Sequence, residues 1–250
     1  MVLRRILGLL QRGDWFTVIL EVFVLVLGIF LGFQVDRLYE DRQVRAEVAG
    51  QLEAIAEDFA ENRVRLETAI GYATAQVEAA MLLRSEGRAP GGQFSTEELN
   101  RAFSVMSGLP TFEAVDFGYQ SLLASGGLTV LGNQQVIREL AGFYAAYQLT
   151  RTIQSSQELQ YVTLLQPYMI RHLDYAASMR PGGADEGQRS RLYPLGNPEL
   201  IREAITTQEF SNIVASQWER AIDLQDDYEG LLERVTRIET LLVQSPNRPR

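Results

Sequence analysis

The sequence contains no cysteine, no lysine and only one histidine, His172. Without cysteine the chain has no disulfide, no thiolate ligand for a metal ion and no cysteine nucleophile. One histidine excludes metal sites that need two, and the position three before it, Met169, excludes the Glu-x-x-His repeat of di-metal bundles. His172 stands beside Arg171 at the end of an expected helix, where a surface or capping role is the commoner one.

The chain is acidic, with a formal net charge of −9, and all 23 of its basic residues are arginine. The surplus of acidic residues falls after the first 21 positions. A protein with this balance repels phosphate backbones, so we expect no nucleic-acid partner.

One long apolar run stands near the N-terminus, at residues 15–35, and Glu21 is its only charged residue. At about 1.5 Å per residue a helix of this length reaches roughly the 30 Å of a bilayer core. The run therefore predicts a transmembrane helix. A cleaved signal peptide is the alternative, but the run is long for one and lacks a small-x-small site before Asp36.

The arginines do not decide the orientation of this helix, because three precede it and three follow it: Arg4, Arg5 and Arg12 before, Arg37, Arg42 and Arg45 after. The free α-amino group adds positive charge in front. We therefore expect a bacterial inner-membrane protein with its N-terminus in the cytoplasm and its C-terminal domain in the periplasm.

Residues 1–14 combine a basic charge with apolar side chains at helical spacing. This pattern suits an amphipathic helix on an anionic lipid surface, with Arg4, Arg5, Arg12 and the interfacial Trp15 as the contacts. A basic tail without fixed structure is the alternative.

Two features inside the run point to a neighbouring helix. Gly28 and Gly32 form a GxxxG pair, which allows another backbone to approach closely, although such pairs are also common by chance. Glu21 lies about 6 Å from the helix midpoint, where a carboxyl group is costly unless it is neutral, paired or facing protein. We predict a partner contact at Glu21, Gly28 and Gly32; a protonated or snorkelling Glu21 is the alternative.

Residues 36–250 have the pattern of a helical domain. Apolar residues recur at steps of three and four from Val48 to Ala80, from Val136 to Tyr168 and from Leu224 to Leu242. In the second stretch we expect Tyr161, Leu164 and Tyr168 on the core side and a kink at Pro167. Glycine and proline mark the boundaries at 87–92, 125–133 and 181–198. The sequence predicts an all-α fold, in which the transmembrane helix continues into an elongated antiparallel bundle.

Helix starts are also legible. Ser95 with Glu98, and Thr206 with Glu209, have the spacing of capping boxes. Asn197 followed by Pro198 is a favourable start for a third helix.

The search for chemistry finds little. Glu53, Glu57 and Glu61 share one helix face and could hold a cation, but Arg65 follows Glu61 by one turn and favours a solvated charged stripe. No nucleophile elbow, Walker loop or dinucleotide fingerprint occurs. We expect no enzyme, no cofactor and no metal.

Two stretches resemble a family of bacterial single-pass membrane proteins of unknown function. They are LEVFVLVLGIFLGFQVDRLYEDR, from Leu20 to Arg42, and the stretch from Phe117 to Leu128 (FGYQSLLASGGL) with the helix start near Asn133. Family members often carry an Asn and a Trp where this chain has Asp36 and Tyr39. The resemblance covers most of the chain and implies a membrane anchor with a helical exterior domain; it brings no catalytic residues.

These observations favour a structural or accessory subunit, whose partners are other membrane protein subunits and the lipid bilayer. A photosynthetic or respiratory assembly is one host for such a subunit, although no residue selects it. The alternative is a periplasmic sensor or ligand-binding module. Because only 14 residues precede the apolar run, its signal would have to pass through another protein.

Overall fold

The computed structural model describes residues 15–89, 92–131, 133–174 and 198–244, and all regular structure within them is helical. The all-α prediction is therefore confirmed. In chain order the elements are α2 (Trp15–Arg88), α3 (Thr96–Met106), α4 (Phe117–Ala124), α5 (Leu128–Leu131), α6 (Gln134–Gln160), a π-helical turn η1 (Tyr161–Leu165), α7 (Gln166–His172), α8 (Pro198–Ala204) and α9 (Gln208–Gln244).

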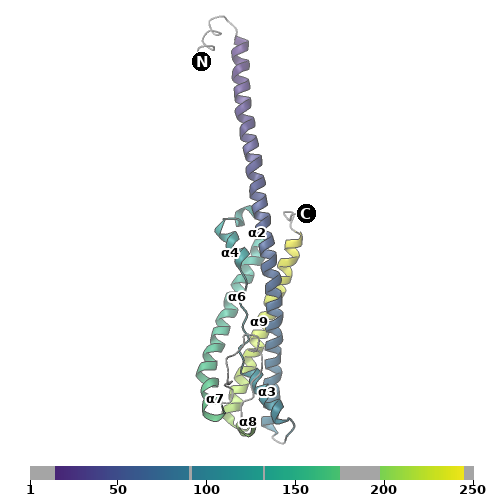
Figure 1. Ribbon diagram of the computed structural model, residues 1–250, viewed down its shortest axis with the longest axis vertical. Coiled ribbons are helices and arrows are strands. Elements are labelled where there is room, and N and C mark those ends of the chain that lie inside the picture. Colours follow the sequence, from purple (N-terminus) through teal and green to yellow (C-terminus); the bar gives the residue numbers. More distant parts are fainter. Residues whose placement is uncertain (1–14, 90–91, 132, 175–197, 245–250) are drawn as a thin grey trace, which may run out of the picture.

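Helix α2 is one unbroken helix of 74 residues, about 110 Å long. Its upper part stands clear of the rest of the molecule, and its lower part forms one edge of the bundle (Figure 1). In the lower part the buried positions alternate in steps of four and three, which is the heptad spacing of a packed helix. They are Val48, Leu52, Ile55, Phe59, Asn62, Leu66, Ala69, Ala73, Gln76, Ala80 and Leu83.

Helices α6 and α9 run beside the lower part of α2 and complete the elongated bundle (Figure 1). Both have the same alternation of buried positions, from Val136 to Gln157 in α6 and from Phe210 to Leu242 in α9. Because α9 returns antiparallel to α2, its C-terminal end lies beside α2 at the point where α2 leaves the bundle (Figure 1).

The core is divided into two apolar clusters along the bundle. One contains Phe59, Phe143 and Leu231 and lies toward the apolar end of α2; the other contains Phe103 and Phe210 and lies at the far end. Buried polar side chains stand between the clusters: Gln76, Thr150, Gln154, Gln157 and Gln217.

An extended segment, residues 107–116, runs through this polar zone and connects α3 to α4. Its backbone is held by side chains rather than by a neighbouring strand. Asn62 donates to Val115 O and accepts from Val115 N, at 2.8 and 2.7 Å. Gln154 binds both backbone groups of Phe112 in the same way. Amide side chains satisfy these groups because they carry the same donor and acceptor as a peptide.

The segment's ends are fixed as well. Gln76 donates to the carbonyl of Gly108 at 2.6 Å, and the buried hydroxyl of Tyr228 donates to Pro110 O at 3.0 Å. After the segment, α4 lies so close to α2 that a Cβ on Gly118 would stand 2.6 Å from Ile55 N. Glycine is required there for the close approach of the two backbones.

The prediction for Leu164 is wrong. Leu164 is half exposed and Leu165 is fully buried. The π-helical turn Tyr161–Leu165 adds one residue to the helix, which moves the core side from position 164 to 165. Pro167 follows it and has no N–H for the regular helical hydrogen bond, so the expected distortion at this point is present, but as a π-turn.

The helix starts were partly predicted. The capping box of Ser95 and Glu98 is confirmed, and Asn133 caps α6. The second box is wrong by one residue: Thr207 accepts from Phe210 N at 3.2 Å, whereas Thr206 donates back to Glu203 O. Helix α8 begins at Pro198, as expected; the preceding loop, 181–197, lies outside the described residues.

Candidate interaction site

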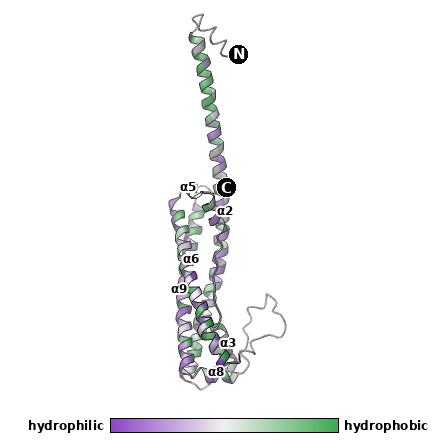
Figure 2. Cartoon of the chain, turned by 90° about the vertical axis from the view of Figure 1, so that its left-hand side faces the viewer, coloured by the Kyte–Doolittle hydropathy of each residue, from purple (hydrophilic) through white to green (hydrophobic). Residues whose placement is uncertain are grey.

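The upper part of α2 is the most exposed apolar surface of the described chain. The stretch Ile19–Tyr39 is long and apolar enough to cross a membrane, and none of it is buried against the rest of the protein. Figure 2 shows it as a largely hydrophobic rod above a bundle whose outer side chains are mixed. The stretch starts four residues later than the predicted one. An apolar surface of this size marks contact with lipid or with another protein.

Glu21, Gly28 and Gly32 lie on one side of this rod. At about 100° per residue, Glu21 and Gly32 stand within about 40° of Gly28. Glu21 is exposed, and a Cβ added to either glycine would meet no atom within 4 Å. The three residues therefore form one accessible strip, shallow at the glycines, with a carboxyl group at one end.

The other predicted contacts lie at the edge of the described chain or beyond it. Trp15 is the first residue of α2, but its side chain is outside the described residues. Arg4, Arg5 and Arg12 are outside them as well. Their role at a membrane surface stays a prediction.

A groove lies between α2 and α9 at the end of the bundle that faces the apolar rod. Its volume is about 760 Å³, and its lining is apolar apart from three glutamates: Ala49, Leu52, Glu53, Ala56, Glu57, Ala60, Glu239, Leu242 and Val243. The small side chains of α2 leave the space, since alanine projects little from a helix surface. Sequence reasoning missed this groove, although the alanine spacing on α2 was a legible signal.

The three glutamates of the groove differ in their partners. Glu239 accepts hydrogen bonds from Arg63, at 3.1 Å from Nε to Oε2, and this bond raises the pKa of the guanidinium. Glu53 and Glu57 are exposed, and no ion pair to either is formed by the described residues. The groove therefore presents two unneutralised carboxylates beside an apolar floor.

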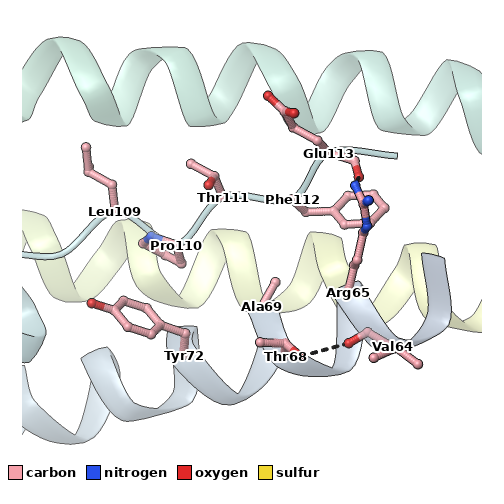
Figure 3. A pocket seen from close by; sticks show the side chains of 10 residues that line it. All are labelled: Val64, Arg65, Thr68, Ala69, Tyr72, Leu109, Pro110, Thr111, Phe112 and Glu113. Carbon is pink, nitrogen blue, oxygen red and sulfur yellow. Dashed lines mark hydrogen bonds between the residues drawn. The ribbon is translucent and has the colours of Figure 1, made fainter. Parts of the chain in front are cut away.

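A second cavity, of about 490 Å³, lies where the extended segment crosses α2 (Figure 3). Val64, Arg65, Thr68, Ala69 and Tyr72 line it from α2, and Leu109–Glu113 line it from the segment. Arg65 donates to Glu61 at 3.0 Å and to Glu113 O at 3.1 Å, and partial burial raises the pKa of Tyr72. The lining therefore offers hydroxyl groups and one guanidinium.

A buried carboxyl group lies near this region, at Asp58. Asp58 accepts from Gly118 N at 2.6 Å. Burial raises the pKa of Asp58, and nearby Asp116 and Glu61 add to this effect, while the Gly118 bond opposes it. The bond links α2 to α4 at their closest approach, which is a structural role.

The residues considered for chemistry do not converge on one centre. His172 is half exposed at the end of α7, with Nε2 at 3.9 Å from Glu209 Oε2. Glu61 pairs with Arg65, in the i, i+4 arrangement expected for a charged stripe. Within the described ranges, no three His, Asp or Glu side chains are placed to bind a metal ion.

Comparison with models of protein families, with curated proteins and with solved structures finds no match to this chain. The resemblance to a membrane protein family thus stays with the two stretches that suggested it.

Proposed function

We propose that this chain is a non-catalytic accessory subunit of a larger membrane protein complex. The apolar helix crosses the bacterial inner membrane, and the bundle stands on the periplasmic side, where it contacts partner subunits.

The observation that carries the proposal is the strip of Glu21, Gly28 and Gly32 on a helix whose other sides are apolar. A carboxyl group within hydrocarbon is costly unless protein or a proton neutralises it. Glycines allow close helix packing, and the described chain supplies no helix to pack there. A helix of a different subunit accounts for both features.

The first test is the size of the native particle. Membranes are solubilised in a mild detergent and separated under native conditions, and the chain is detected by an antibody. We expect it in a particle much larger than 28.1 kDa plus detergent. A lone chain would contradict the proposal, and Glu21→Gln with Leu27→Gln as matched control tests the strip: only the first should weaken the complex.

The orientation has its own test. A C-terminal fusion to alkaline phosphatase, which is active only in the periplasm, should be active, and a fusion to a fluorescent protein that folds only in the cytoplasm should be dark. The reverse pattern would place the bundle in the cytoplasm.

The cavity in Figure 3 supports a second candidate function, a ligand-binding module that signals through a partner. Its hydroxyl groups and Arg65 suit a small anionic ligand. A thermal-shift screen of the full chain against small carboxylates tests this: a specific stabiliser whose effect disappears in Arg65→Gln, but not in Arg101→Gln, would favour it.

A further inference from the structure

The groove and the glycine strip lie on the same side of α2. Glu53 follows Gly28 by 25 residues and Glu57 follows it by 29, so at about 100° per residue both stand within about 20° of Gly28. No proline or glycine interrupts the helix between Asp36 and Ala49. One straight partner can therefore lie along α2 from the strip to the groove.

The groove defines the chemistry of this partner. Its floor, which includes Leu52 and Leu242, needs apolar side chains, while Glu53 and Glu57 need cations beside them. Both requirements are met by an amphipathic helix that carries arginine or lysine along the edge of an apolar stripe.

A second copy of this chain does not meet them. Two copies anchored in the same membrane run parallel, so a symmetric contact through this side would place Glu21, Glu53 and Glu57 opposite their own equivalents. Facing like charges oppose association. The occupant must therefore be a different polypeptide.

We propose that the groove binds a basic helix of another membrane subunit, which first packs on Gly28 and Gly32 and then continues outward along α2. This inference rests on the proposed membrane span. The groove residues Ala49 to Ala60 lie 10 to 21 positions beyond Tyr39, about 15 to 32 Å along the helix. The partner's helix thus extends about 20 residues past its own span.

Site-specific photo-cross-linking in intact cells tests the proposal. The photoreactive phenylalanine derivative benzoyl-phenylalanine is introduced at Leu25, beside the strip, at Ala60, in the groove, and at Leu149, on the exposed side of α6 as control. We expect Leu25 and Ala60 to cross-link the same polypeptide and Leu149 to give none of it. The peptide captured from Ala60 should carry two or more basic residues.

The other outcomes separate the two proposals. Cross-links from Leu25 alone overturn the groove proposal and leave the accessory function standing, whereas none from either position contradicts both. A dimer of this chain, a product with residues 245–250 of the same chain, or different polypeptides at Leu25 and Ala60 each overturn the shared basic helix.

Charge reversal tests the electrostatic part. Glu53→Arg combined with Glu57→Arg should lower the cross-linking yield from Ala60 about fivefold or more. Glu78→Arg, an exposed site further along α2, is the matched control and should leave the yield unchanged. Equal melting temperatures show that the bundle is intact, and an unchanged yield in the double variant overturns the basic partner.

Discussion

The two halves of α2 are one continuous helix, but they are stabilised in different ways. From Val48 to Leu83, buried residues recur every three or four positions and pack against α9, α3 and α4. From Ile19 to Tyr39, no position is buried and the surface is apolar around most of the circumference. The lower half has its packing partners within the chain, and the upper half requires lipid or another protein to cover it.

This difference has a practical lesson. The same substitution should unfold the bundle when it is made in the lower half and should leave the bundle intact when it is made in the upper half. The upper half is then measurable through association rather than through stability.

The largest expected difference is between two phenylalanines. Phe59 is fully buried, with its ring 4.9 Å from that of Phe143, whereas Phe23 is 60% exposed. Phe59→Ala should lower the free energy of unfolding by about 3–5 kcal/mol because it leaves a cavity. Phe23→Ala should leave it unchanged. Urea denaturation of the full chain in detergent, followed by circular dichroism, measures both; equal effects would contradict the contrast.

A smaller loss is expected at Asn62, a polar residue within the buried seam of the lower half. Asn62→Leu keeps the volume but leaves both backbone groups of Val115 without their partner. We expect a loss of roughly 2–3 kcal/mol. Asn100→Leu, at a buried position of α3 whose Oδ1 has no partner, is the control and should cost less in the same denaturation experiment.

Two glycines sharpen the contrast between covered and open helix surface. A methyl group on Gly118 would clash with the backbone of Ala54 and Ile55, so Gly118→Ala should cost about 1–3 kcal/mol. Gly71, on an open side of α2, has no atom within 4 Å, and Gly71→Ala should stabilise the helix by about 0.5–1 kcal/mol. Melting temperatures should move in opposite directions; a shift in the same direction would refute the close approach of α4.

The smallest effect depends on pH. Burial raises the pKa of Asp227 above its ordinary 3.8, with Asp223 and Asp226 adding to the shift. The protonated carboxyl group therefore stabilises the fold below pH 3.8, and this contribution is lost as the pH rises through the higher folded value. Asp227→Asn should accordingly stabilise the protein at pH 7 by roughly 0.5 kcal/mol and give no gain near pH 3.5.

Melting curves at both pH values measure the effect. Glu219→Gln, at an exposed site of α9, is the control. A gain for Asp227→Asn that is equal at both pH values would contradict the role of charge.

Much of the bundle could be predicted from the sequence because its information is local. Heptad spacing in α2 and α9, the box at Ser95 and the cap at Asn133 each depend on residues within a few turns. Leu164 was misplaced because a π-turn changes the register without altering the apolar pattern. The threaded segment 107–116 was not foreseen, since its partners lie 42 and 53 positions away, at Gln154 and Asn62.

The candidate site shows the same division. Glu21 and the glycine pair are legible because a charge and two small residues stand out in an apolar run. The groove depends on α9 returning beside α2, which spacing in either helix alone does not reveal. The polar residues at core positions, such as Asn62 and Gln76, were the available signal that something other than a helix packs against the seam.

The unbroken length of α2 makes it a lever arm. From Tyr39 to Arg88 the helix extends about 75 Å, so a change of 5° in its tilt at the membrane moves the far end sideways by about 6 Å. A rearrangement too small to alter contacts among neighbouring spans would thus reposition α3 and α8 by more than half the diameter of a helix.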